Sequence, residues 1–198
     1  FYFSVFFTVG YCVFTRQWLL LIASMLWGRI IEIGGMSIAL HRYFSHGSFS
    51  CNKVTSRLLG FLGCLSLNGD PIFWASVHNG SHHRYADTEK DVHSPIHGIF
   101  HSYLGWIIDP KTFDSLRFEY AGKRALSDKW FVYYQRYYLT IVTLTFLVVY
   151  NISPMFFFMS FIPGIFLAFN QGPMVNVLCH SSIGHRNYDT NDNSNNIN

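Results

Sequence analysis

Long apolar runs limit the fold of this sequence more strongly than any other feature. Residues 18–40, 131–150 and 154–177 are apolar, and residues 1–14 form a shorter run of the same kind. A helix needs about 20 apolar residues to cross a bilayer. We therefore expect an all-α integral membrane protein, a four-span helical bundle in which the first span is partial.

The composition agrees with a membrane protein. Of the 198 residues 50% are hydrophobic and 13% are charged, whereas a soluble domain usually carries about 25% charged residues. The net charge of +3 is weak and scattered, so we expect no nucleic-acid partner. The cysteines form no CxxC pair and predict no disulfide framework: Cys12, Cys51, Cys64 and Cys179.

One further apolar segment, Leu58–Val77, is ambiguous because "NGDP" interrupts it at Asn68–Pro71. A turn with an aspartate in the middle of a bilayer is expensive. If this segment crossed the membrane, histidines before and after it would lie on opposite faces. We interpret it as re-entrant or interfacial, which brings all of them to one face.

The charged residues then orient the chain. On the far side, Arg16 is the only basic residue in a loop. The other basic residues of the loops lie on the histidine side. By the positive-inside rule, that side is cytoplasmic. Residues 41–130 and 178–198 are therefore expected in the cytoplasm or at the interface, as a helical cap on a bacterial inner membrane or the endoplasmic reticulum.

Histidines gather at the membrane exits, in "HRYFSH", in "HNGSHH" and after the last span. The set is His41, His46, His78, His82, His83 and His180. On a helix, residues four apart share a face. This spacing predicts that His78 and His82 face one metal and leaves His83 for a second.

The residue types narrow the choice of metal. Cysteine is absent at ligand spacing, which argues against thiolate zinc and iron–sulfur sites. Imidazole suits iron, zinc, copper and nickel, and the set exceeds the four ligands of one tetrahedral zinc. A haem would want two facing histidines inside a bundle. Two metals that share the set are the economical interpretation. Two redox-active irons beside a hydrocarbon layer would indicate oxygen chemistry on an apolar substrate.

Three stretches, "HRYFSH", "HNGSHHRYADTEKDVHSP" and "NVLCHSSIGHRNYDTNDNS", resemble landmarks of the membrane fatty acyl desaturases. More narrowly, they are similar to the acyl-CoA (stearoyl-CoA, delta-9) type. The resemblance runs from about Gly34 to the last residue. It implies a single desaturase domain over residues 1–198, with a mushroom-shaped helical bundle and a cytoplasmic cap that carries a histidine-rich di-iron site.

The resemblance also implies roles for individual residues. The six histidines match its iron ligands, and Asn176 matches an asparagine that holds one iron through a water. Trp74 resembles a tryptophan that lines the bend of the acyl tunnel. Apart from the resemblance, Asp87, Glu89 and Asp91 are candidates to accept hydrogen bonds from ligand imidazoles, which fixes their tautomer. A solvated charged loop is the equal alternative.

Other histidines have weaker signals. His93, His97 and His101 show helical spacing, but we interpret them as interfacial residues or supports of the ligands. His93 belongs to the family's "HSP" element, without being an iron ligand there. His185 is interpreted as structural.

Arg29 and Glu32 form a pair of charges within a predicted span, and such intramembrane charges usually indicate a functional site. A pair in which each residue neutralises the other is an equal alternative.

The sequence departs from the family in two ways. The second histidine box is HxxxHH rather than the common HxxHH, which weakens the assignment of His78. The third box, another HxxHH, is absent before Asn198. Both ends look cut, so we expect a fragment of a longer protein that is inactive alone.

The leading interpretation is an oxygen-dependent fatty acyl desaturase that introduces a cis double bond into a long-chain acyl group, with acyl-CoA and the delta-9 position expected. It would use two iron ions and O₂. Electrons would come from cytochrome b5 or a ferredoxin docking on the basic face. The rivals are a histidine-rich membrane hydroxylase of alkanes, lipids or sterols, and a non-enzymatic metal transporter or lipid sensor.

Overall fold

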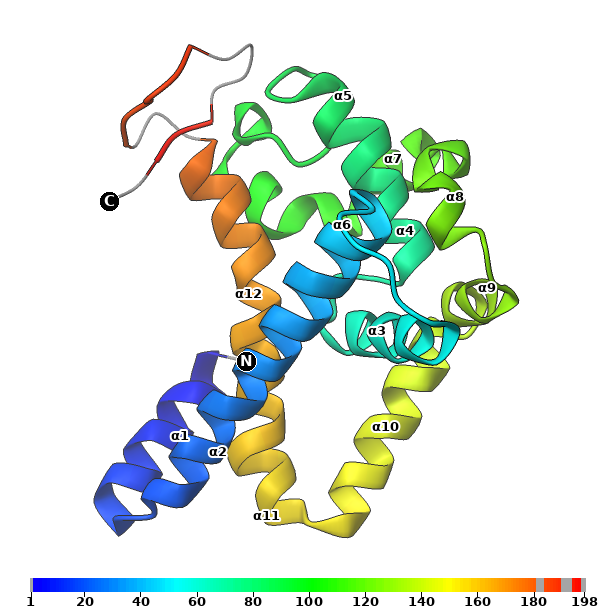
Figure 1. Ribbon diagram of the computed structural model, residues 1–198. Helices are drawn as coiled ribbons and strands as arrows, with labels where there is room; N and C mark the ends of the chain where they lie inside the picture. Colours follow the sequence, from blue (N-terminus) through cyan, green and yellow to red (C-terminus); the bar gives the residue numbers. More distant parts are fainter. Residues whose placement is uncertain (1, 181–183, 190–193, 197–198) are drawn as a thin grey trace.

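The computed structural model describes residues 2–180, 184–189 and 194–196. Within them every regular element is a helix, apart from an isolated bridge between His185 and Asn196. Long helices form one half of the molecule and short helices gather around the other half (Figure 1). The all-α expectation is confirmed, and the predicted tail 178–198 lies partly outside the described residues.

The first apolar hairpin consists of α1 (Tyr2–Thr15) and α2 (Trp18–Arg29). α2 continues without a break into η1 (Ile30–Ser45), a π-helical stretch whose hydrogen bonds reach the fifth residue. Together, Trp18–Ser45 is long and apolar enough to cross a membrane. The helix runs past the predicted end at residue 40, so the first histidines lie on its final turn.

The second apolar hairpin begins with α10 (Tyr138–Ile152). It returns through α11 (Pro154–Phe156), η6 (Phe157–Phe161) and α12 (Ile162–Cys179). Pro154–Cys179 is the second helix of the described residues that is long and apolar enough to cross a membrane. Its extent agrees closely with the predicted run 154–177.

The predicted run 131–150 is divided in the structure. Its first part belongs to α9 (Lys129–Arg136), which buries Phe131 and Tyr134 in one core cluster with Phe44 of η1, Cys64 and Ile72. Tyr137 then leaves helical geometry, with φ −113° and ψ 24°. The apolar helix therefore starts at Tyr138 rather than at residue 131, because the earlier aromatic side chains pack on protein.

The ambiguous segment forms two helices, α3 (Lys53–Leu65) and α4 (Pro71–Val77). The carboxylate of Asp70 accepts hydrogen bonds from the N–H groups of Ile72 and Phe73. A capping aspartate followed by proline is a strong start for a helix. The segment thus breaks at the turn predicted from "NGDP".

Short helical elements connect α4 to α9 and cover the ends of η1 and α12 (Figure 1). They are η2 (His78–His82), α5 (His83–Tyr85), η3 (Pro95–His97), η4 (His101–Gly105), α6 (Trp106–Ile108), α7 (Pro110–Ser115), η5 (Phe118–Ala121) and α8 (Gly122–Ala125). α4 runs directly into η2, so the packing of α4 determines where the second histidine motif lies.

The buried core lies where η1, α3 and α4 meet. Leu40, Trp74 and Trp106 belong to one buried cluster beside the histidines. Gly35 allows α3 to approach η1 closely, because a Cβ at this position would lie 2.4 Å from the carbonyl oxygen of Leu62. The backbone of η1 is therefore held firmly before the first histidine.

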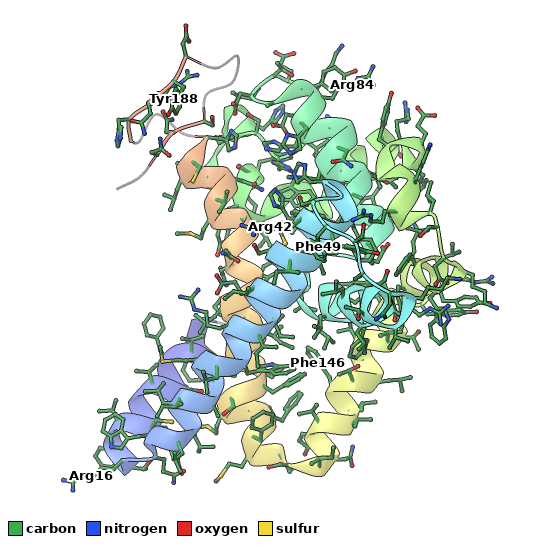
Figure 2. The ribbon with its side chains drawn as sticks, in the orientation of Figure 1. Arg16, Arg42, Phe49, Arg84, Phe146 and Tyr188 are labelled. Atoms are coloured by element: carbon green, nitrogen blue, oxygen red, sulfur yellow. The ribbon has the colours of Figure 1, made fainter. Side chains whose placement is uncertain are left out.

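Charged and apolar side chains are distributed unevenly over the molecule (Figure 2). Arg16 lies at the tip of the first hairpin, whereas Arg42 and Arg84 lie toward the short helices. Phe14 of α1, Leu19 of α2 and Leu139 of α10 are 75–90% exposed. Large apolar side chains exposed along several helices mark a surface that is not built for water.

Candidate metal centre

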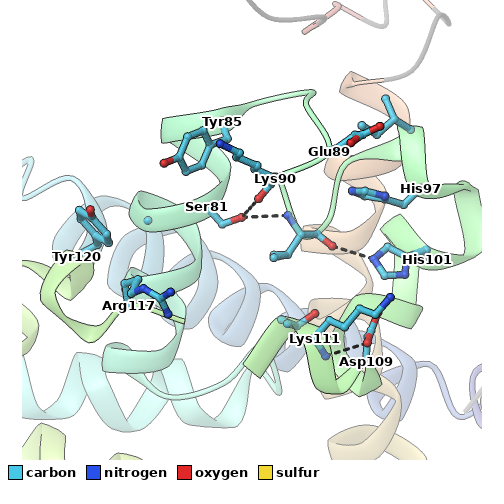
Figure 3. Close-up of a pocket in the computed structure, with 14 residues that line it drawn as sticks. Ser81, Tyr85, Glu89, Lys90, His97, His101, Asp109, Lys111, Arg117 and Tyr120 are labelled. Carbon is cyan, nitrogen blue, oxygen red and sulfur yellow. Dashed lines mark hydrogen bonds between the residues drawn. The ribbon is translucent and has the colours of Figure 1, made fainter. Parts of the chain in front are cut away.

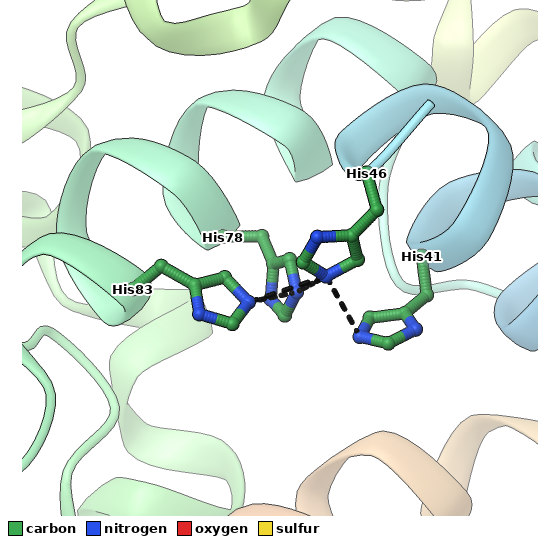
Figure 4. A group of neighbouring side chains, drawn as sticks. All are labelled: His41, His46, His78 and His83. Atoms are coloured by element: carbon green, nitrogen blue, oxygen red, sulfur yellow. Dashed lines mark hydrogen bonds between the residues drawn. The ribbon is translucent and has the colours of Figure 1, made fainter. Parts of the chain in front are cut away.

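Four histidines from η1 and the α4–α5 segment point toward one another (Figure 4). The Nε2 atom of His46 lies 3.2 Å from that of His41, 3.1 Å from that of His78 and 3.2 Å from that of His83. The Nε2 atoms of His78 and His83 are 3.0 Å apart. We call these four residues the first histidine group. Their convergence is the arrangement of a metal ligand set.

π-helical turns create this group. His41 and His46 are five residues apart, as are His78 and His83. The N–H of His46 donates to the carbonyl of His41, and the N–H of His83 donates to that of His78. A turn that closes on the fifth residue brings residues five apart to one face. The prediction that pairs His78 with His82 was therefore wrong, because it assumed α-helical turns. π turns are rare and occur frequently at functional sites.

His82 faces a second set of residues instead. Its ring centroid lies 4.9 Å from that of His180, which ends α12. The Nδ1 of His82 lies 3.0 Å from the carboxylate of Asp91, and the Nδ1 of His180 lies 3.2 Å from that of Asp87. We call these four residues the second histidine group. When Nδ1–H donates to a carboxylate, Nε2 is left for a metal.

His93 completes the surroundings of the second group. It is buried, and its ring centroid lies 4.5 Å from that of His82. Its Nδ1 lies 3.6 Å from the other oxygen of Asp91, which thus stands between two imidazoles. The rings of His82 and His83 are 5.4 Å apart, so the two histidine groups are direct neighbours.

The loop after α5 has an unusual backbone that positions its carboxylates. Asp87 adopts a left-handed conformation with φ 61°, which aspartate tolerates better than most residues. Its N–H donates to Asp91 at 3.3 Å. Glu89, the third acidic residue of this loop, is exposed and lines a different cavity. Of the three predicted acceptors, two face histidines.

Burial sets the protonation states of these residues. It lowers the pKa of His78 and of His83, and it lowers that of His93 to about 3. Burial alone would raise the pKa of Asp91, but the hydrogen bond from His82 and the nearby His93 lower it to about 2. These histidines are thus neutral and Asp91 is ionised. Metal ligands and their acceptors need those states.

A cavity of about 270 Å³ opens beside both histidine groups. Its wall consists of Met36, Ser37, His41, Trp74, His78, His82, His83, Gln171, Gly172, Val175, Asn176 and His180. The indole of Trp74 is stacked on His78, with ring centroids 5.6 Å apart. The predicted positions Trp74 and Asn176 therefore lie on the same wall as five of the six predicted histidines.

Two buried nitrogens on this wall have no hydrogen-bond partner among the described residues, Nδ2 of Asn176 and Nε1 of Trp74. An unpaired buried donor costs about 1–3 kcal/mol. Asn176 lies one helical turn before His180, so its unsatisfied amide lies beside the second group. Neutral imidazoles with this amide fit iron, and the donor set alone also suits zinc or copper.

Several wall residues were not predicted, among them Met36, Gln171 and Gly172. A signal was available in the sequence. Met36 lies about one turn before His41, and Gly172 lies one turn before Asn176. Residues one turn from a site residue on the same helix face the same space.

A larger cavity of about 900 Å³ lies among the short helices (Figure 3). It shares no lining residue with the cavity beside the histidine groups. His97 and His101 line it, together with residues of both charges. Gly98, with φ 101°, ends the helix between these two histidines. The continuous helix that their spacing with His93 would require is therefore not formed.

Two remaining predicted features lie away from the histidine groups. Arg29 and Glu32 form an ion pair of 2.7 Å, in which the arginine side chain is exposed. This geometry favours mutual neutralisation. His185 is exposed and bridges to Asn196.

Comparisons with known proteins agree with the geometry. The family model for "Fatty acid desaturase" matches residues 16–198. The chain is 30% identical to "Acyl-CoA 5-desaturase AL21" of Anemone leveillei, with 92% of this chain and 57% of the relative aligned. It is 32% identical to "Delta-9 acyl-lipid desaturase 2" of Arabidopsis thaliana, over 88% of this chain and 58% of the relative.

The chain thus spans less than three fifths of the length of either relative. The match nevertheless covers the histidine groups, the cavity beside them and both long apolar helices. The chain belongs to the fatty acid desaturase family.

Proposed function

We propose that the whole protein is an oxygen-dependent fatty acyl desaturase that introduces a cis double bond into a long-chain acyl group. One observation carries the proposal: two adjacent histidine groups share a wall of a cavity that also contains Trp74 and Met36. The C–H bonds of methylene groups have no useful acidity, so a metal must supply the oxidation.

Each histidine group would hold one iron. The first iron would bind His41, His46, His78 and His83, whose Nε2 atoms already converge. The second would bind His82 and His180, with Asn176 contributing through a water. This division modifies the prediction from sequence, because His83 joins the first group and His82 the second.

Bound iron would supply the O₂-dependent removal of two hydrogens from adjacent methylenes. The chain's own residues do the positioning. The wall with Trp74 and Met36 holds methylenes and excludes water. Asp87 and Asp91 keep protons on Nδ1 of His180 and His82, which aims both Nε2 atoms inward. His93 supports Asp91 from its other side.

The membrane arrangement is part of the proposal. We propose four spans, built from α1, the long helix 18–45, α10 and the helix 154–179, with the histidine groups on the cytoplasmic face. The exposed apolar side chains of α1, α2 and α10 support this arrangement. So does the position of Arg16 at the tip of the first hairpin (Figure 2).

The substrate carrier and the electron source complete the proposal. Acyl-CoA and the delta-9 position are our first choice, and the names of the two relatives include an acyl-CoA and an acyl-lipid desaturase. Two electrons per turnover would come from cytochrome b5 or a ferredoxin on the basic cytoplasmic face. Charge steering accelerates such encounters.

The test is expression of the whole protein in a host that lacks its own desaturase, followed by mass spectrometry of the acyl chains and the bound metal. We expect an alkene and two irons per chain. An alcohol product would instead establish a hydroxylase. Metal uptake without any oxidised product would establish a transporter.

A further inference from the structure

A third cavity lies where α9 ends and α10 begins. Its volume is about 610 Å³, within the range of roughly 300–1,000 Å³ typical of ligand sites. Leu67, Phe73, Ile107, Phe113 and Leu139 form its apolar wall. These residues come from the turn before α4, from α4 itself, from α6 and α7, and from the start of α10.

Several polar groups that line this cavity are engaged in the fold, although Oδ1 of Asn68 has no hydrogen-bond partner among the described residues. Asp70 caps α4, and the amide nitrogen of Asn68 donates to the carbonyl of Ser66 at 3.0 Å. Arg136 is exposed at the rim, with its guanidinium 5.5 Å from the ring centre of Tyr137. The cavity therefore offers an apolar interior and one cation at its mouth.

The surface around the mouth changes character at Tyr137. Up to and including this residue, Trp130, Tyr133 and Tyr137 are 41–46% exposed beside charged residues. After it, the exposed residues of α10 are mostly apolar, as at Leu139, Leu144 and Val148, and none is charged. Aromatic and basic residues that give way to an apolar helix mark the interface of a bilayer. With α10 as a span, which rests on the proposed topology, the mouth lies at the level of lipid headgroups.

We propose that this cavity binds a glycerophospholipid of the bilayer, with one acyl chain inside and the phosphate at Arg136. The apolar wall matches a hydrocarbon chain, and a guanidinium is well suited to a phosphate. The site also adjoins the metal centre. Phe73 lines it, and the next residue of α4, Trp74, stacks on His78. A bound lipid would thus brace the helix that carries the second histidine motif.

The experiment uses the protein in phosphatidylcholine nanodiscs that contain a phosphatidylglycerol with a photoreactive diazirine in its acyl chain. After irradiation, mass spectrometry locates the adducts. We expect adducts on Phe73 and Ile107, which are only partly exposed and which bulk lipid reaches poorly. Adducts on the exposed Leu144 report separately that α10 lies in the bilayer.

A matched pair of variants tests the cavity. Ile107→Trp adds a ring to the wall, and Ile108→Trp adds the same ring to the neighbouring residue, which is 70% exposed and does not line the cavity. We expect about tenfold fewer adducts on Phe73 in the first variant, because an overfilled site loses binding. The second should match the wild type. Arg136→Gln should lower labelling of Phe73 by the anionic probe and leave labelling of Leu144 unchanged.

The outcomes separate the two proposals. Labelling of Leu144 without labelling of Phe73 overturns the lipid site and leaves the topology intact. Labelling of neither residue overturns the topology, and with it the site. If a photoreactive acyl-CoA labels Phe73 and displaces the phospholipid probe, the cavity belongs to the substrate carrier and the lipid assignment is wrong.

Discussion

The two histidine groups solve the same problem of orientation in different ways. In the first group, four imidazoles from two helical segments face one another, and none of them has a hydrogen bond to a carboxylate among the described residues. Backbone geometry orients them, through π turns at His41–His46 and His78–His83. In the second group, Asp87 and Asp91 hold His180 and His82 by hydrogen bonds.

This difference teaches where each group is vulnerable. The first depends on turns within η1 and η2, so its geometry is a property of the scaffold. The second brings together a loop and the end of α12, which are distant in the sequence, and carboxylates are needed to fix the ring orientations. We therefore expect substitutions of acidic residues to affect the second group selectively.

The largest effect should follow removal of one ligand from either group. In the whole protein, His83→Ala and His82→Ala should each reduce unsaturated product to background, because alanine cannot fill the open coordination position. Iron content should fall in both. The measurements are mass spectrometry of products in a desaturase-deficient host and metal analysis of the purified protein. Wild-type levels of product from either variant would refute the assignment.

Asp91→Asn should come next. Asp91 contacts both His82 and His93, and loss of such a partner typically weakens metal binding by about 10–100-fold. In a chelator competition, one iron per protein should exchange faster than in the wild type, and the other iron should exchange at the wild-type rate. Glu89→Gln is the matched control, since Glu89 lies in the same loop but faces another cavity. Equal loss of both irons in Asp91→Asn would contradict the division into groups.

Asp87→Asn should have a smaller effect, near the lower end of that range or about tenfold, because one histidine depends on Asp87. Asparagine also tolerates the left-handed backbone at this position. Asp87→Val should be worse, since a β-branched residue strains that conformation. Chelator-induced iron release from the two variants is the comparison. Equal release rates would show that the backbone conformation of Asp87 is unimportant.

The smallest effect on the histidine groups should come from packing beneath the first of them. Gly35→Ala places a Cβ 2.4 Å from the carbonyl oxygen of Leu62, and such overpacking costs about 1–3 kcal/mol of stability. Gly34→Ala is the control, because its nearest contact would be an ordinary 3.6 Å. Thermal unfolding in detergent should separate the variants. Loss of iron at unchanged stability would place Gly35 in the site instead.

Local patterns of the sequence were sufficient to predict several elements of the fold and of the metal centre. Apolar runs predicted the long helix ending near His41 and the helix that begins at Pro154, because the thickness of the bilayer's hydrocarbon core sets the length of a helix that spans it. The "NGDP" turn predicted the break before α4, since aspartate and proline favour a helix start. The gathering of histidines at helix ends was also predictable from their spacing, and the resemblance to the desaturases implied Asn176 and Trp74 beside them.

Tertiary structure decided the rest. Spacing alone paired His78 with His82, and the π turn of η2 reversed this by closing on the fifth residue. Packing of Phe131 and Tyr134 against η1, α3 and α4 moved the start of α10 to Tyr138. The sequence by itself determined which residues are apolar, which can bind a metal and where the "NGDP" turn breaks the helix before α4. Only the fold decided which histidines meet, because backbone turns and distant carboxylates, rather than distance along the chain, orient a ring.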